Sequence, residues 1–77
     1  MGFMIKDTFA KRLKAARMNR GITKSDLAVL CGVSRKTLFN WESGDRLPKN
    51  LYHTAELLSY ILHVDLDYWF REESASS

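Results

Sequence analysis

The sequence predicts a compact all-α domain of five short helices. Apolar residues recur at steps of three and four along most of its 77 residues, which is the spacing of one helix face. Glycines at positions 21, 32 and 44 and the single proline at position 48 divide the chain at intervals that suit short helices. No stretch alternates with the period of two that marks a strand. We therefore expect one helical domain over residues 1–71 and a disordered polar tail over 72–77.

The first helix is expected from residue 5 to about residue 20. Gly21 ends it, because glycine readily takes the left-handed conformation of a helix C-cap. The core face of this helix consists of Ile5, Phe9, Leu13 and Ala16.

Small polar residues mark where the next two helices begin. Thr23 is expected to cap a second helix over about residues 24–30, with an acid three residues further on as in a capping box. Ser34 is expected to cap a third helix over about residues 35–43. A glycine follows each of these helices and ends it. Their inward-facing side chains, with one from the turn, are those of Leu27, Ala28, Cys31, Val33, Leu38 and Trp41.

Two further helices are expected after Pro48, which cannot continue the third helix. The fourth runs over about residues 50–62, and residues 63–64 make a short break. Asp65 is expected to cap a last short helix. The apolar positions of these two helices are Leu51, Ala55, Leu58, Leu62, Leu66, Tyr68, Trp69 and Phe70.

Basic residues are concentrated in the first two thirds of the chain. Residues 1–49 hold eleven of the twelve Lys and Arg residues and four acids, a net charge of +7. Residues 50–77 hold one Arg and five acids, a net charge of −4. A basic surface attracts polyanions, and the release of counterions supplies affinity. An uneven but merely solvated surface is the alternative on composition alone.

The side chains needed for catalysis or metal binding are not grouped in this sequence. His53 and His63 are ten residues apart and have no Cys or carboxylate arranged with them as ligands, so we expect no metal. The sequence also has no Gly-rich phosphate loop, no paired carboxylates and no base beside its cysteine, so we expect no other cofactor and no enzyme. Cys31 is the only cysteine, and we expect a buried, inert thiol rather than a redox sensor. We expect no membrane span and no signal peptide, which together with the lone thiol indicates the cytoplasm.

Residues 23–44 have the organisation of a helix-turn-helix. Two short helices, each with its own cap, are separated by a glycine at the turn. Ala28 is small where the helices must cross closely, and Val33 and Leu38 fix their angle. The N-terminal end of the third helix then projects, so that its outward side chains can enter a major groove.

This segment resembles the helix-turn-helix of the phage-repressor and Cro family, whose members read approximately Thr-Gln-x-x-Leu-Ala-x-x-x-Gly-Val-Ser-x-x-x-Ile-x-x-Trp-Glu-x-Gly. The resemblance covers about residues 5–70 and is most specific over residues 23–44. It implies a compact five-helix, repressor-like domain that binds operator DNA as a dimer, in a bacterium or phage. It also implies that Arg17 pairs with Glu42 and thereby fixes the third helix.

The chain departs from the family pattern in four places. Lys24 stands where the family has Gln, and Phe39 stands at a position that is commonly polar. Val29 and Leu30 lie on a face of the second helix that is usually charged. The fourth helix is about two residues longer than in the common pattern.

Four outward residues of the third helix are expected to contact bases. Arg35 and Lys36 follow the cap, and Arg commonly reads guanine through O6 and N7. Asn40 lies further along the same face and can pair with adenine, while Thr37 can meet a thymine methyl group or a phosphate. A solvated side chain is the alternative for each.

Phosphate contacts are expected from both sides of the third helix. Thr23 and Lys24 open the second helix, where free N–H groups and the helix dipole suit an anion. Arg46 and Lys49 lie in the loop after the third helix and can hold the DNA backbone there. For Phe39 two interpretations stay open, namely contact with a thymine methyl group or sugar, and packing under the fourth helix.

Three adjacent aromatic residues near the C-terminus, Tyr68, Trp69 and Phe70, exceed what so small a domain can bury. At least one should fill the core, and we expect the surplus to form a homodimer interface. A monomer is the alternative.

Two functions of different classes follow. The first is sequence-specific binding of double-stranded DNA by a transcriptional regulator, foremost a repressor acting as a homodimer on a palindromic operator. The second is a protein-interaction module, such as the antitoxin of a toxin–antitoxin pair, which would hold a protein partner through Val29, Leu30, Phe39 or the fifth helix. Arg35 and Lys36 at the projecting helix end favour DNA.

Overall fold

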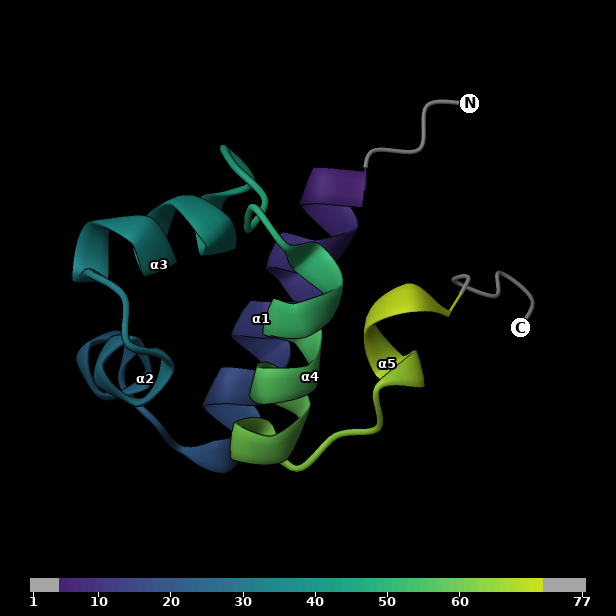
Figure 1. Ribbon diagram of the computed structural model, residues 1–77. Helices are drawn as coiled ribbons and strands as arrows, with labels where there is room; N and C mark the ends of the chain where they lie inside the picture. The colour runs from purple at the N-terminus through teal and green to yellow at the C-terminus, as the bar shows by residue number, and fades with distance from the viewer. Residues whose placement is uncertain (1–4, 72–77) are drawn as a thin grey trace.

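The computed structural model describes residues 5–71, and in that range it contains five α-helices and no strand. Their bounds are Ile5–Arg20 for α1, Lys24–Cys31 for α2, Arg35–Ser43 for α3, Leu51–Leu62 for α4 and Asp67–Phe70 for α5. α1 and α4 lie side by side at the centre, with α2 and α3 on one side of them and α5 on the other (Figure 1). The prediction of an all-α fold is confirmed.

The local signals of the sequence determine where the helices begin. The side-chain oxygen of Thr23 accepts a hydrogen bond from the Asp26 N–H at 3.1 Å, and that of Ser34 accepts one from the Thr37 N–H at 3.1 Å. Asn50 caps α4 in the same way. Each of these bonds satisfies one of the N–H groups that a helix start leaves without an intrahelical partner.

The ends of α2 and α5 differ from the sequence-based expectation. α2 continues one residue further, to Cys31, before Gly32 ends it in the left-handed conformation at φ 74°. Asp65 was expected to cap the fifth helix with its side chain, and this is wrong. α5 begins at Asp67 without a side-chain cap, and Asp65 contributes its main-chain carbonyl, which accepts from the Tyr68 N–H at 2.9 Å. A second main-chain bond, from the Trp69 N–H to the Leu66 carbonyl at 3.2 Å, accompanies it at this end of the helix.

The core lies where α1, α2, α3 and α4 meet. Its buried members include most of the inward positions expected in α1 to α4, and five leucines are almost fully buried: Leu13, Leu27, Leu38, Leu58 and Leu62. Leu51, also expected to face inward, is only partly buried and packs against this core. Cys31 and Val33 are only partly buried, because both lie at the edge of the α2–α3 turn. The side chain of Ile5 and residues 72–77, the expected tail, lie outside the described part of the chain.

α5 is attached to the central helices by its aromatic residues. Trp69 is 4% exposed, its ring centroid lies 5.4 Å from that of Phe9, and its Nε1 donates to Ser59 Oγ at 2.8 Å. Tyr68 Oη donates to the Arg12 carbonyl at 2.8 Å, while Arg12 Nη1 donates to the Tyr68 carbonyl at 2.9 Å. Burial raises the pKa of Tyr68, an effect that the nearby positive charges of Arg12 and Arg71 partly offset.

Candidate nucleic-acid interface

The turn between α2 and α3 is short and closed by main-chain hydrogen bonds. Gly32 N–H donates back to the end of α2, and Val33 N–H donates to the Ala28 carbonyl at 3.0 Å. Ala28 itself is 1% exposed, so the small side chain lets α3 approach α2 closely. The α2 and α3 helices are therefore packed closely against each other, and α3 lies at the edge of the molecule (Figure 1).

A charged pair fixes α3 on α1. Arg17 Nε donates to Glu42 Oε2 at 2.6 Å, and Arg17 Nη2 donates to Glu42 Oε1 at 3.2 Å, so the contact is bidentate. The third donor, Nη1, binds the Ile22 carbonyl at 2.8 Å and so also holds the segment that leads into α2. The side chains are 11% and 2% exposed for Arg17 and Glu42. The planar guanidinium group, with its three hydrogen bonds, fixes the position of α3 more firmly than apolar contact alone.

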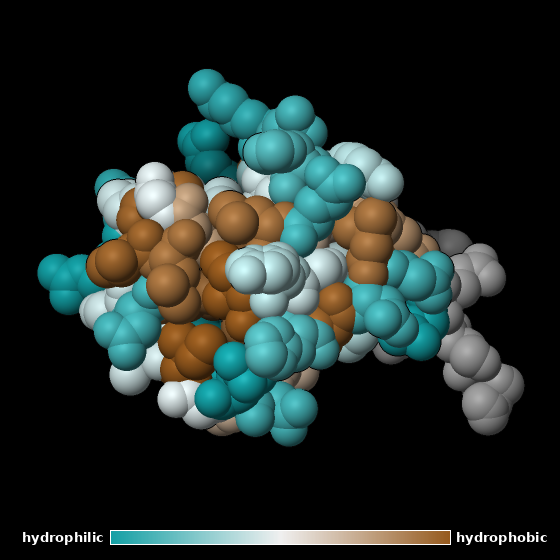
Figure 2. All heavy atoms as spheres, turned by 60° about the horizontal axis from the view of Figure 1, so that its bottom comes forward, coloured by the Kyte–Doolittle hydropathy of each residue, from teal (hydrophilic) through white to brown (hydrophobic). Residues whose placement is uncertain are grey.

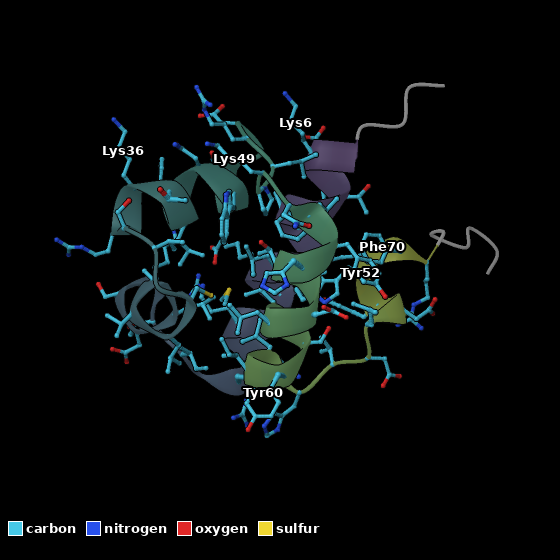
Figure 3. The ribbon with its side chains drawn as sticks, viewed as in Figure 1. Lys6, Lys36, Lys49, Tyr52, Tyr60 and Phe70 are labelled. Atoms are coloured by element: carbon cyan, nitrogen blue, oxygen red, sulfur yellow. The ribbon has the colours of Figure 1, made fainter. Side chains whose placement is uncertain are left out.

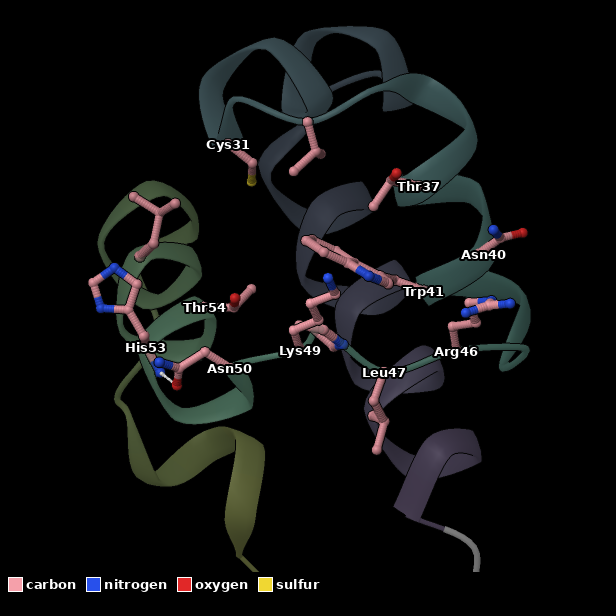
Figure 4. A pocket seen from close by; sticks show the side chains of 13 residues that line it. Cys31, Thr37, Asn40, Trp41, Arg46, Leu47, Lys49, Asn50, His53 and Thr54 are labelled. Carbon is pink, nitrogen blue, oxygen red and sulfur yellow. Dashed lines mark hydrogen bonds between the residues drawn. The ribbon is translucent and has the colours of Figure 1, made fainter.

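The outer surface of α3 carries the four residues expected to contact bases. Arg35 and Lys36 are exposed, and Lys36 points away from the body of the protein (Figure 3). Thr37 and Asn40 are half-buried; Thr37 lies on the side toward α4, whereas the Asn40 side chain points to the outer side of α3, next to Arg46 (Figure 4). The Thr37 hydroxyl oxygen accepts from Ser34 Oγ at 3.0 Å, which ties this side chain to the helix cap. The basic residues thus project furthest, with the two shorter polar side chains beside them.

The loop after α3 is organised around one carbonyl. The Asn40 carbonyl accepts hydrogen bonds from the N–H groups of Gly44, Asp45 and Arg46. Figure 4 shows the Asn40 and Arg46 side chains next to each other on the outer side of this bend. Further along, the loop packs against the body of the protein: Pro48 is buried, and Leu47 packs against the core. Arg46 therefore lies in a defined place next to α3 rather than on a free loop.

A groove of about 520 Å³ separates this loop and α3 from α4. Its floor is apolar and includes Trp41 and Leu47, while Arg46, Lys49 and His53 stand on its walls (Figure 4). Arg46 and Lys49, both expected to contact phosphate, are exposed. The groove opens beside the outer surface of α3, so both cations border the surface that α3 would present to DNA.

Lys6 is a further cation on this face that the sequence did not single out. Lys6 and Lys36 point to the same side of the molecule, and Lys49 lies between them, although the three come from α1, α3 and the loop before α4 (Figure 3). The start of α1 lies close to the end of α3. Gly44, which follows α3, is so near Asp7 of α1 that a Cβ atom at this glycine would lie 3.0 Å from Asp7 Oδ1. No local signal predicts this arrangement, since it depends on how α1 crosses α3.

The start of α2 is linked to α3 through Lys24 and Phe39. The Lys24 ammonium lies 5.0 Å from the centroid of the Phe39 ring, within the range of a cation–π contact. Phe39 is 53% exposed and is not part of the core cluster, so it does not pack under α4. Thr23 is exposed beside them, although its hydroxyl oxygen is occupied as the cap of α2.

The three aromatic residues expected at a dimer interface differ in how deeply they are buried. Trp69 fills the core and is unavailable to a second molecule, and Tyr68 is half-buried against Arg12. Phe70 is 45% exposed and stacks on Tyr52 of α4, with ring centroids 6.0 Å apart. The exposed aromatic surface at α5 is therefore the Tyr52–Phe70 pair (Figure 3).

Apolar side chains also gather on the face that lies at the bottom in Figure 1 (Figure 2). Val29 is 78% exposed and Leu30 is 55% exposed, both on the outer side of α2. Met18 and Leu57 are further exposed apolar residues, on α1 and α4. This surface is separate from the outer side of α3, where the cations project.

Metal-ligating and thiol side chains were the other candidates for a site. Among residues 5–71, no group of three or more His, Cys, Asp or Glu side chains is placed to hold a metal ion. Cys31 is half-buried at the groove, and burial raises the pKa of its thiol to about 11, which makes the reactive thiolate scarce at neutral pH. No helix in the described part of the chain is long and apolar enough to cross a membrane.

Comparison with known proteins gives concordant matches. A family model described as helix-turn-helix (HTH_3) matches residues 13–69. The chain is 35% identical over 66 residues to an uncharacterized HTH-type transcriptional regulator, YqaE, of Bacillus subtilis, covering 86% of this chain and 55% of YqaE. The fold is similar to the crystal structure of an HTH_3 family transcriptional regulator from Vibrio cholerae. That match has a TM-score of 0.74 and 30% identity, over 87% of this chain and 36% of that chain. The chain thus spans about half and about a third of these two proteins.

Proposed function

Because this chain belongs to the HTH_3 helix-turn-helix family, we propose that it is a DNA-binding transcriptional regulator that inserts α3 into the major groove. One observation carries the proposal. α3 projects from the domain with Arg35 and Lys36 exposed, while the buried Arg17–Glu42 pair holds it in a fixed position. A recognition helix needs both properties, since base edges are read only by side chains that reach them in a reproducible register.

In this proposal the residues around α3 divide into two groups. Arg35, Lys36, Thr37 and Asn40 contact base edges, with Arg35 suited to guanine and Asn40 to adenine. Thr23, Lys24, Arg46 and Lys49 contact phosphates on the two sides of the helix and set its register. Lys6 adds a phosphate contact beside Lys49. The support is the position of the labelled lysines on one side of the molecule in Figure 3 and the exposure of Lys6, Arg46 and Lys49.

We further propose that the regulator is a homodimer that represses transcription from a palindromic operator. The exposed Tyr52–Phe70 pair supports an interface at α5, since aromatic residues are enriched in the buried centre of interfaces. In such a dimer the two α3 helices would lie about one DNA turn, roughly 34 Å, apart, as binding to two successive major grooves requires. A dimer covering such a site would exclude polymerase from an overlapping promoter. The site of action is then the cytoplasm of a bacterium, where the DNA lies.

Selection from a random duplex pool, at near-physiological salt, tests the proposal. We expect a palindromic consensus with half-site centres about one helical turn apart. Arg35→Ala should change the base preferred at one position of each half-site, whereas Lys49→Ala should weaken binding to all duplexes alike. Weak, salt-sensitive retention without enrichment of any sequence would contradict specific recognition, because it shows that only phosphates are contacted.

A protein-interaction module is the second candidate, and the exposed apolar face of α2 favours it. Val29 and Leu30 are adjacent and mostly exposed, and Met18 and Leu57 are further exposed apolar residues. An antitoxin would use such a face for its toxin. Val29→Asp should then abolish binding of the partner and leave DNA binding unchanged, whereas Arg35→Ala should change the base preference and leave binding of the partner unchanged. The two functions are compatible in one protein because the surfaces are separate.

A further inference from the structure

Phe39 and Lys24 form a contact that the assignment of base and phosphate contacts leaves unexplained. Phe39 is 53% exposed on a helix whose other outward residues are polar, and the Lys24 ammonium lies 5.0 Å from the centroid of its ring. Exposure of a phenyl ring to water is unfavourable, and the neighbouring outward residues of α3 are polar, so they offer the ring no apolar contact. Lys24 is half-buried, although the first residue of a helix is ordinarily well solvated. Each side chain therefore restricts the other.

The position of Phe39 on α3 places the ring among the residues that face DNA. It follows Lys36 by three residues, one helical turn, and directly precedes Asn40. Leu38 and Trp41 on the opposite side of α3 are buried, so the Phe39 side of the helix faces outward. If α3 enters the major groove, the ring enters with it.

The chemistry of a phenyl ring limits what it can recognise there. Arg35, Lys36 and Asn40 all offer hydrogen-bond donors, and Phe39 offers none. The thymine C5-methyl group is the apolar group that a base pair presents in the major groove. The matching partner for Phe39 is therefore a pyrimidine methyl group.

Lys24 completes this contact from the start of α2. Its ammonium group lies over the ring and still keeps donors for a phosphate oxygen. The contact favours one relative placement of the lysine and the ring, so the two side chains lie beside each other on the surface that would face DNA.

We propose that Lys24 and Phe39 act together as a thymine-recognition unit, in which the Phe39 ring contacts a C5-methyl group and Lys24 binds the phosphate beside that base. This inference rests on the proposed function. It goes further by assigning a base-specific contact to an aromatic residue, and by making Lys24 a determinant of sequence preference rather than a plain phosphate contact.

The test uses the full chain and the duplex that the wild-type protein selects. Each thymine in a half-site is replaced in turn by uracil, which keeps the base pair and its hydrogen-bonding edge and removes only the methyl group. We expect one position at which wild-type affinity falls about fourfold per methyl group, the effect of losing one buried group of that size. Phe39→Ala should bind the thymine duplex more weakly and should not distinguish it from the uracil duplex.

Two variants separate the roles of the ring and the cation. Phe39→Leu keeps an apolar side chain and should retain part of the sensitivity to uracil. Lys24→Met keeps the alkyl chain but removes the charge, so it should lower the salt dependence of binding by about one ion per half-site and also reduce the sensitivity to uracil. Leu30→Ala, which alters a comparably exposed apolar residue on the outer side of α2, is the matched control and should leave both quantities unchanged.

The outcomes distinguish this inference from the proposed function. A wild-type protein that selects a sequence but shows no thymine sensitive to uracil overturns the inference and leaves the function standing. The same holds if Phe39→Ala keeps the wild-type ratio between the two duplexes. A wild-type protein that selects no sequence overturns both. Because Phe39 is largely exposed, circular dichroism of its variants should match the wild type.

Discussion

Replacing Arg17 by methionine should destabilise the domain more than any exposed substitution. Methionine keeps an unbranched apolar side chain of similar reach, but it removes all three hydrogen bonds that Arg17 makes, two to Glu42 and one to the Ile22 carbonyl. The Glu42 side chain is only 2% exposed, and in the described part of the chain its hydrogen bonds come from Arg17. The substitution therefore leaves a buried carboxylate without its cation.

The magnitude follows from this geometry. Removing one partner of a buried pair costs about 3–5 kcal/mol, because the remaining charge is neither solvated nor paired. At roughly 0.05–0.15 kcal/mol per residue, a domain of 77 residues has a total stability of about 4–12 kcal/mol. For a domain of this size each kcal/mol shifts Tm by about 4–8 °C, so we expect Tm to fall by at least about 12 °C. The variant should be at the limit of folding.

Thermal and urea unfolding, followed by the fluorescence of the buried Trp41 and Trp69, provide the measurement. Arg20→Met, at an exposed position in the last turn of the same helix, is the control and should stay within about 0.5 kcal/mol of the wild type. The double variant Arg17→Met/Glu42→Met removes both charges and should recover much of the loss. A cost below about 1 kcal/mol for Arg17→Met, or strict additivity in the double variant, would refute the reasoning.

Three further outcomes can be measured. Arg35→Ala should relax base preference at one position of the selected site. Lys49→Ala should weaken binding to all duplexes and lower the salt slope by about one. If Arg35→Ala also weakened binding to all sequences equally in a filter-binding assay, this distinction would be contradicted. Cys31, with its pKa raised to about 11 from 9.0, should react with a disulfide reagent roughly tenfold more slowly when folded than in urea. The thiolate fraction is about 100-fold lower, and higher nucleophilicity offsets only part of this. The rate should rise as the pH approaches 11, and equal rates for folded and unfolded protein would argue against this environment. Phe70→Ala should raise the dimer dissociation constant about tenfold in sedimentation equilibrium. Tyr60→Ala, at the other end of α4, should not, and an unchanged constant for Phe70→Ala would remove α5 from the interface (Figure 3).

The sequence by itself predicts the helices and most of the core, because these depend on local interactions. A cap such as that of Ser34 needs only a hydroxyl and an N–H group three residues later, and a C-cap such as Gly32 needs only a residue that tolerates positive φ. The spacing of apolar residues likewise identifies the buried face of each helix before any neighbour is known. The outward position of Arg35 and Lys36 follows from the same periodicity.

The tertiary structure decided the roles of side chains that contact other helices. Nothing in the run Tyr68, Trp69 and Phe70 shows which ring enters the core, because the answer depends on where α5 meets Phe9 and Ser59. Such contacts join residues far apart in sequence, and their distances are set by helix crossing angles that local patterns do not encode.

On the outer face of α3, too, the sequence shows which residues are present, and packing decides which of them meet. Both Lys24 and Phe39 are visible in the sequence as departures from the family pattern, but the 5.0 Å contact between them depends on the angle of α2 to α3. Lys6 joins the basic face only because α1 starts next to the end of α3 (Figure 3). The sequence therefore determined the helices and the chemistry available on each one, while packing decided which side chains share a surface, since only packing fixes distances between helices.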